Sequence, residues 1–243
     1  MRFGWGVLSC LVALALGAGP VRAQQQAEQV DLALILAVDV SSSVDEGEAG
    51  IQRTGYIAAM KDPKIVEAIR GGLTGKIVVT YVEWASPSDQ RVIVPWRTIT
   101  DAATAAAFAT ELEKSAYRPG STTSISAGID FCVKLLNASG INAIRRVIDM
   151  SGDGYSDYGR DVRAARDDAV KAGIIINGLP VMNERAPYRT KIPEDLDTYY
   201  KNNVTGGRGA FTLAVKKLDD FNKLILQKLI LEIASLEPQK SPG

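Results

Sequence analysis

The fold is decided by residues 32–48, whose sequence is LALILAVDVSSSVDEGE. Residues 32–38 form a continuous apolar run, which is typical of a β-strand that is buried on both faces of a parallel sheet. The run ends at Asp39, and hydroxyl side chains follow at Ser41, Ser42 and Ser43. A carboxylate and three hydroxyl groups therefore stand where a buried strand is expected to end.

Strand and helix patterns alternate through the rest of the chain. Ser43 and Glu46 fit a capping box, so a helix is expected from there to about residue 60, with a second short helix near residues 65–69. Strands are also expected at 76–84, 91–96, 146–151, 173–179 and 210–215, and helices at 101–114, 125–136, 160–171 and 226–233. This order predicts an α/β fold with a doubly wound, mostly parallel six-stranded sheet. The 76–84/91–96 hairpin supplies one antiparallel edge strand, and helices cover both faces.

The first 23 residues have the pattern of an export signal, with a basic Arg2, an apolar stretch at 7–18 and a cleavage site at Val21-Arg22-Ala23. The apolar stretch is shorter than the roughly 20 residues that a spanning helix needs. We therefore expect an exported protein, periplasmic or secreted, without a membrane span in the mature chain; an uncleaved N-terminal anchor is the alternative. The expected organisation is a signal at 1–23, a polar lead-in at 24–30, one domain at 31–236 and a tail at 237–243.

The composition excludes several classes of function. The chain has no histidine, which rules out Ser-His-Asp and Cys-His catalysis and most catalytic zinc sites. Loss of Arg2 and Arg22 with the signal would leave 26 basic and 28 acidic side chains, which gives no electrostatic case for nucleic-acid binding. Cys132 would then be the only cysteine. It lies in an apolar helical pattern and is expected to be a buried, unreactive thiol.

Three segments offer oxygen ligands. Asp39 and Asp153 each follow a predicted strand, and the threonines at 122–123 lie in the loop before a predicted helix. Alternate residues at a strand end can point to the same side, so Ser41 and Ser43 can join Asp39. Carboxylate and hydroxyl oxygens suit the hard cations Mg²⁺, Mn²⁺ and Ca²⁺. With few carboxylates the cation would keep an open position, which an acidic residue of a partner could fill.

This arrangement resembles the von Willebrand factor type A domain and its metal-ion-dependent adhesion site. That site joins an Asp-x-Ser-x-Ser strand end, a threonine loop and a later aspartate, and the resemblance covers most of the expected domain. It implies metal-assisted protein binding and the strand order 3-2-1-4-5-6. The ligands it implies are Asp39, Ser41, Ser43, Thr123 and Asp153, with Thr122 as the alternative to Thr123. Gly152 departs from the family, which commonly has threonine there, and this puts the support around the ligands in doubt.

More narrowly, the chain is similar to a group of secreted bacterial proteins that carry this domain with unknown function, in its signal, its DVSSSVD strand end and its SGDG turn. We expect a non-enzymatic module in which Mg²⁺ or Mn²⁺ captures a carboxylate of a protein partner. The alternative is a metal-dependent hydrolase of phosphatase or esterase type, with Glu83 or Asp157 as the base. A third interpretation keeps the fold but makes the site vestigial.

Other segments have simpler interpretations. Asp149 interrupts a buried strand and is expected to be a hydrogen-bonded structural carboxylate. Residues 71–76, GGLTGK, are not expected to bind phosphate, because Ile77 replaces the required hydroxyl residue and a strand follows. Trp84 is expected to pack on its own sheet. Residues 182–209 form the longest irregular connection and are a candidate region for partner contacts.

Overall fold

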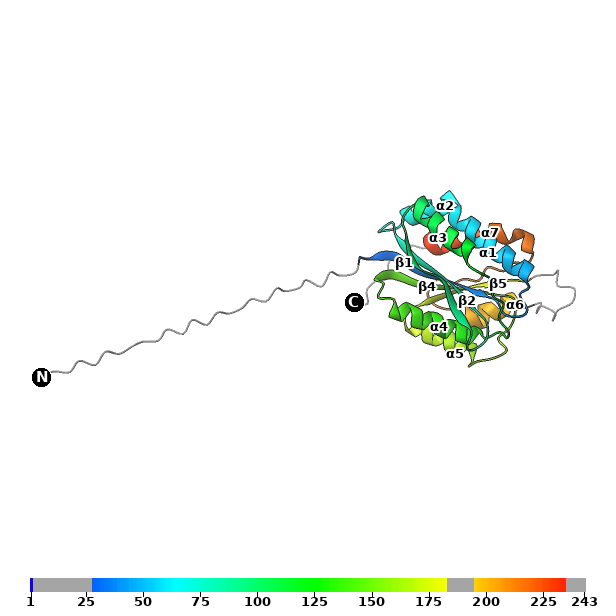
Figure 1. Ribbon diagram of the computed structural model, residues 1–243. Helices are drawn as coiled ribbons and strands as arrows, with labels where there is room; N and C mark the ends of the chain where they lie inside the picture. The colour runs from blue at the N-terminus through cyan, green and yellow to red at the C-terminus, as the bar shows by residue number, and fades with distance from the viewer. Residues whose placement is uncertain (2–27, 183–194, 235–243) are drawn as a thin grey trace.

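A computed structural model describes residues 1, 28–182 and 195–234, which form a sheet between two layers of helices (Figure 1). Apart from Met1, the predicted signal at 1–23 lies outside the described residues, as does the predicted tail at 237–243. No helix among the described residues combines the length and the apolar character that crossing a membrane requires.

The sheet has five strands in the order β3-β2-β1-β4-β5. The strands are β1 (Val30–Asp39), β2 (Ile77–Trp84), β3 (Gln90–Ile99), β4 (Ala143–Gly152) and β5 (Ile175–Pro180). β1 lies between β2 and β4 and is parallel to both, β5 is parallel to β4, and β3 is antiparallel to β2. This confirms the predicted α/β fold with a mostly parallel sheet and an antiparallel edge hairpin.

β1 is central because both of its faces are apolar. Leu34 and Leu36 pack into the core on one face of the sheet, whereas Ala33 and Ile35 pack into the core on the other. Successive side chains of a strand point to opposite faces, so a run without polar residues can only lie between two covering layers. The strand ends where the chain leaves this double core, at Asp39.

The prediction of a sixth regular strand is wrong, because residues 210–215 make only isolated bridges within the described chain, one to Gly178 of β5 and one to Val181 just beyond it. The segment does lie beside β5, as the predicted strand order requires: the Gly178 N–H donates to the Phe211 carbonyl, and the Val215 N–H donates to the Pro180 carbonyl. A regular parallel ladder needs the N–H of residue 180 between these bonds. Proline has no N–H, so the ladder is broken there.

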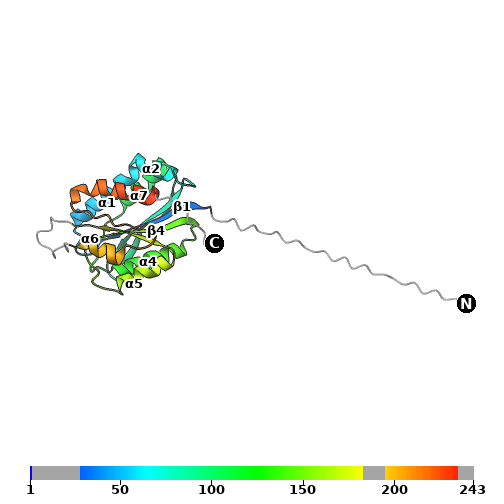
Figure 2. The same cartoon turned by 180° about the vertical axis from the view of Figure 1, so that it is seen from behind.

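The helices divide between the two faces of the sheet, as the two opposite views show (Figures 1 and 2). One face carries α1 (Glu46–Lys61), α2 (Pro63–Arg70), α3 (Ala102–Lys114) and α7 (Phe221–Ala234), with a 3₁₀ turn at Leu218–Asp220 before α7. The other face carries α4 (Ile125–Ala138), α5 (Val162–Lys171) and α6 (Leu196–Tyr199), which continues into a π-helical turn at Tyr200–Val204.

The predicted capping box at the start of α1 is wrong. The N-cap is Asp45, whose carboxylate accepts a hydrogen bond from the Glu48 N–H at 2.8 Å. An aspartate caps a helix at least as well as a serine does, and here it stands two residues later. Ser43 therefore does not cap α1, and its hydroxyl donates to a residue of another loop.

Lys228 of α7 is fully buried against the sheet together with Asp149 of β4 and Glu232 of α7. Its ammonium forms ion pairs with both carboxylates, and Glu232 also accepts a hydrogen bond from the Asn177 side chain at 3.0 Å. Asp149 is thus a structural carboxylate, as predicted. The predicted apolar stripe of α7 is partly wrong, because Lys228 and Glu232 share its buried face while Leu226 and Ile230 are only partly buried.

This buried cluster predicts that stability depends on pH. Burial and the neighbouring Asp149 raise the pKa of Glu232 from 4.5 to about 7, although Lys228 opposes the shift. The folded state then holds a proton that the unfolded state releases, so stability falls as the pH rises from about 4.5 to about 7. We expect Glu232 to contribute a slope of up to about 1.4 kcal/mol per pH unit, and Glu232→Gln to make the slope shallower by that amount. Urea unfolding at a series of pH values measures it; the same slope in both proteins would contradict this account.

Candidate metal site

Three loops meet at the carboxyl end of the sheet, where the strand order reverses between β1 and β4. The first follows β1, the second precedes α4 and the third follows β4. The Ser42 N–H of the first loop donates to the Ser121 carbonyl of the second at 2.9 Å. The Asp157 N–H of the third loop donates to the Thr123 carbonyl at 2.8 Å. Backbone hydrogen bonds therefore join all three loops.

The side chains of the five predicted ligands form one hydrogen-bonded cluster. The Thr123 hydroxyl donates to the Ser41 hydroxyl at 3.1 Å, and the Ser41 and Ser43 hydroxyl oxygens lie 3.0 Å apart. The Ser43 hydroxyl donates to Oδ1 of Asp153 at 2.5 Å. Oδ1 of Asp39 accepts the Ser41 N–H at 2.7 Å. One of these hydrogen bonds, between Ser43 and Asp153, joins residues 110 positions apart in the sequence.

The two candidate threonines differ in position. Thr123 is 5 % exposed and its hydroxyl faces Ser41, whereas Thr122 is partly exposed. The extra residue in this loop is therefore accommodated before Thr123, and the Thr123 side chain is the one that joins the cluster.

The electrostatics of the cluster favour a cation. Burial raises the pKa of Asp39 well above its usual range, and the charge of Asp153 raises it further, while hydrogen bonds from Ser41 lower it. Oδ2 of Asp39 is buried and accepts no hydrogen bond from the described residues. A buried acceptor without a donor costs about 1–3 kcal/mol. A divalent cation would pair with this oxygen and cancel the repulsion between the two carboxylates.

The donor set fits a hard and incompletely ligated cation. The described residues contain no group of three or more histidine, cysteine or carboxylate side chains placed to hold a metal. The cluster offers two carboxylates and three hydroxyls instead, which are oxygen ligands of the kind that Mg²⁺ and Mn²⁺ accept. A cation held in this way would keep positions for outside ligands.

A protein-family model described as "Protein of unknown function (DUF1194)" matches residues 29–237. The chain belongs to this family. No curated protein matches the sequence of this chain.

Solved structures share the fold of this DUF1194 protein. The pilus adhesin SpaC from Lactobacillus rhamnosus GG superposes with a TM-score of 0.61 at 15 % identity, over 84 % of this chain and 31 % of the adhesin. A von Willebrand factor type A protein from Catenulispora acidiphila superposes with a TM-score of 0.56 at 14 % identity, over 86 % of this chain and 44 % of that protein. Proximal thread matrix protein 1 from the mussel byssus, with a zinc-occupied MIDAS motif, superposes with a TM-score of 0.56 at 12 % identity. The superposition covers 84 % of this chain and 46 % of the matrix protein. The chain spans less than half of each relative, and the likeness shows a von Willebrand factor type A-like fold.

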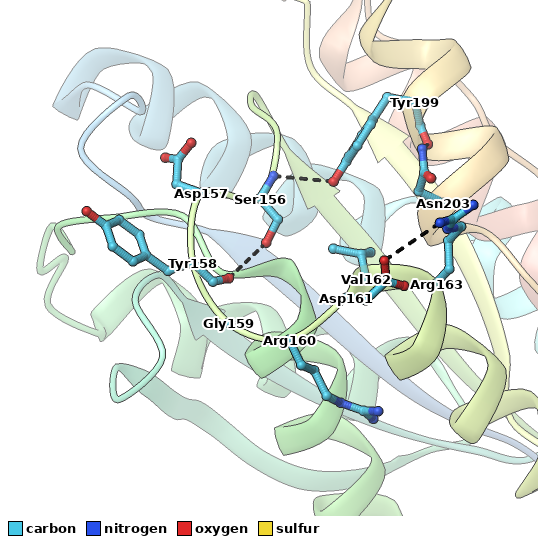
Figure 3. A pocket seen from close by; sticks show the side chains of 10 residues that line it. All are labelled: Ser156, Asp157, Tyr158, Gly159, Arg160, Asp161, Val162, Arg163, Tyr199 and Asn203. Carbon is cyan, nitrogen blue, oxygen red and sulfur yellow. Dashed lines mark hydrogen bonds and ion pairs between the residues drawn. The ribbon is translucent and has the colours of Figure 1, made fainter.

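A polar pocket of about 330 Å³ lies at the third loop of the DUF1194 protein, and its lining residues are drawn in Figure 3. It is lined by residues 156–163 of the third loop and by Tyr199 and Asn203. The Ser156 N–H donates to the Tyr199 hydroxyl at 3.4 Å, and Tyr158 is 56 % exposed at the rim. Since the third loop bonds to the Thr123 carbonyl, this pocket and the cluster share one wall. A second pocket of about 460 Å³ adjoins the first loop and includes Asp45 and Tyr117 among its lining residues.

The residues named for a hydrolase are not part of the cluster. Glu83 is buried and forms ion pairs with Arg53 and with Arg91, the latter at 3.5 Å. Burial raises the pKa of Glu83, but hydrogen bonds and charge from Arg53 oppose the shift. Asp157 is exposed on the third loop.

The structure also describes Trp84, Cys132 and residues 71–76, and the predicted burial of Cys132 is confirmed. Trp84 is fully buried, but it packs against α4 and not on its own sheet alone, since a Cβ at Gly128 of α4 would lie 3.2 Å from its ring. Cys132 is fully buried, and burial raises the pKa of its thiol. Residues 71–76 do not resemble a phosphate loop in structure, because the Asp31 carboxylate already accepts their N–H groups, at 2.9 Å from Thr74 and 3.0 Å from Gly75.

The sequence did not identify Tyr200 as a neighbour of the cluster. Tyr200 is fully buried at the start of the π-helical turn, and its hydroxyl accepts or donates no hydrogen bond among the described residues. Burial raises its pKa well above the usual range, and the nearby charges of Asp39 and Asp153 raise it further. The only signal in the sequence was the departure at Gly152, whose backbone lies against the Tyr200 hydroxyl.

Proposed function

We propose that this protein is an exported, non-enzymatic binding module that captures a carboxylate of a protein partner through Mg²⁺ or Mn²⁺. The observation that carries the proposal is the hydrogen-bonded cluster of two carboxylates and three hydroxyls at the strand-order reversal. The residues that would hold the cation are Asp39, Ser41, Ser43, Thr123 and Asp153.

Each side chain has a distinct role in this proposal. Asp39 and Asp153 supply the negative charge, and the hydroxyls of Ser41, Ser43 and Thr123 supply neutral oxygens. The bound cation supplies an electrophilic position at the rim. Because the two protein carboxylates only balance its charge, the cation keeps an affinity for a third carboxylate that approaches from outside.

The solved relatives support protein binding as the use of this site. One is a pilus adhesin and another is a thread matrix protein whose MIDAS motif holds zinc. The two pockets that flank the cluster offer places for side chains beside the captured carboxylate. Export rests on the signal pattern at residues 1–23.

The hydrolase alternative has less support. Hydrolysis at this cation would need a base beside the reacting atoms. Glu83 forms ion pairs with arginines outside the cluster. The Asp157 side chain is exposed, and the hydrogen bond from Asp157 to Thr123 is made by its backbone N–H.

The paired threonines provide a matched test of the site. We expect Thr123→Val to weaken Mn²⁺ binding by at least about 10-fold, equivalent to about 1.4 kcal/mol, because it removes one oxygen ligand while keeping the side-chain shape. Thr122→Val makes the same chemical change one residue away and should bind Mn²⁺ as wild type does. Titration followed by the electron paramagnetic resonance signal of free Mn²⁺ measures both. If Thr122→Val weakens Mn²⁺ binding and Thr123→Val does not, Thr122 is the ligand and Thr123 is not.

A further inference from the structure

We propose that Tyr200 is a positioning residue of the cation site, whose hydroxyl donates a hydrogen bond to Oδ2 of Asp39 when the cation is bound. In the structure the two groups are not hydrogen-bonded to each other. This inference rests on the proposed function, because it assigns a role around the same cation. Tyr200 follows α6, so the inference adds a fourth segment of the chain to a site whose predicted ligands come from three loops.

The backbone brings Tyr200 to the site by an irregular turn. Tyr200 begins the π-helical turn Tyr200–Val204, which is closed by a hydrogen bond of 2.8 Å from the Thr205 N–H to the Tyr200 carbonyl. Single π turns of this kind occur often at functional sites, because the wider turn re-aims one side chain. Here the side chain is fully buried and aimed at the end of β4.

The Tyr200 phenol and the Asp39 carboxylate both approach Gly152. A Cβ built on Gly152 would lie 2.5 Å from the Tyr200 hydroxyl oxygen and 2.9 Å from Oδ2 of Asp39. The two oxygens therefore flank the same point. Each is buried and neither has a hydrogen-bond partner among the described residues. The Tyr200 hydroxyl is a donor without an acceptor, and Oδ2 of Asp39 is an acceptor without a donor, near the same point.

This pairing is compatible with a cation on the same carboxylate. A carboxylate oxygen has two lone pairs, so Oδ2 can accept from Tyr200 and still bind a cation. Oδ1 is already oriented by the Ser41 N–H at 2.7 Å. With a second donor on Oδ2, both oxygens of Asp39 would be held, and ligating carboxylates in proteins are commonly held in this way.

The same contact explains why residue 152 is glycine. Any Cβ at this position would approach the Tyr200 hydroxyl and Oδ2 of Asp39 more closely than side chains tolerate. Gly152 and Tyr200 are therefore two parts of one arrangement: the glycine leaves the space, and the phenol uses it to reach Asp39.

Tyr200→Phe tests the role because it removes only the hydroxyl. We expect Mn²⁺ affinity to fall about 10- to 100-fold, the usual cost of losing a group that holds a metal ligand. The metal-free variant should unfold at the same temperature as wild type or higher, because its hydroxyl is unpaired in the metal-free protein. Tyr56→Phe is the matched control: it removes another buried hydroxyl, from the core on the opposite face of the sheet, and should leave Mn²⁺ affinity unchanged.

A second pair of variants tests the contact itself. Gly152→Ala should weaken Mn²⁺ binding in the wild-type background and weaken it less in the Tyr200→Phe background, where the atom it approaches most closely is gone. If Tyr200→Phe binds Mn²⁺ as tightly as wild type while Asp39→Asn has lost binding, the role of Tyr200 is refuted and the proposed function stands. If wild type itself binds no divalent cation, both are refuted.

Discussion

Mg²⁺ at roughly 100-fold its dissociation constant should stabilise the wild-type protein by about 2.7 kcal/mol, and the Asp39→Asn/Asp153→Asn variant by nothing measurable. Binding to the folded state alone produces this gain. The two asparagines keep a side-chain oxygen that can accept from the Ser41 N–H and the Ser43 hydroxyl, so the variant removes charge and preserves these two hydrogen bonds. Urea unfolding in Mg²⁺ and in EDTA measures the difference.

The metal-free state separates a functional site from a structural one. Burial and the charge of Asp153 both disfavour the ionised form of Asp39 and raise its pKa. Removing both charges should therefore leave the stability in EDTA unchanged or higher. Asp157→Asn is the control, since Asp157 is an exposed carboxylate on the third loop and should leave the Mg²⁺ effect intact. An equal Mg²⁺ effect in wild type and in the double variant would contradict the site.

Lys228→Met should lower the free energy of unfolding by about 3–5 kcal/mol, which is the usual cost of breaking a buried ion pair by removing one partner. Lys228 is fully buried and is the cation that pairs with both Asp149 and Glu232. Methionine keeps much of the volume of the lysine stem, so the loss would come from two carboxylates left without a counter-charge. The pair with Asp149 joins α7 to β4, whereas the pair with Glu232 lies within α7.

Lys223→Met is the control for this prediction, because Lys223 is exposed on the same helix and its loss should change stability by less than about 0.5 kcal/mol. Adding Asp149→Asn and Glu232→Gln to Lys228→Met removes the stranded charges and should restore part of the stability. Chemical denaturation compares the four proteins. Wild-type stability in Lys228→Met would mean that the buried cluster does not anchor α7.

The order of strands and helices was predictable because periodicity and turn residues act locally. The apolar run at 32–38 is typical of a strand covered on both faces, and strands that are parallel place their carboxyl ends at one edge. That edge contains both Asp39 and Asp153. The convergence of the candidate ligands therefore followed from the fold, and their hydrogen bonds are found in the structure.

Other features depended on contacts that no local pattern reveals. A proline at the end of β5 breaks the ladder to residues 210–215, and its effect depends on which strand lies alongside. Ser43 was open to two interpretations from sequence, and only the position of Asp45 decided that it does not cap the helix. Lys228 and Glu232 are charged residues of a kind that is usually exposed, and only their pairing with Asp149 makes burial possible.

The measurement that tests metal-dependent binding most directly is capture of the partner from the native exported fraction. Tagged wild-type protein and the Asp39→Asn/Asp153→Asn variant are each incubated with that fraction in Mg²⁺ and in EDTA, and retained proteins are identified by mass spectrometry. The account predicts a protein that wild type retains in Mg²⁺ and releases in EDTA, and that the variant never retains. Recovery of the same proteins by wild type and variant, with or without metal, would contradict it.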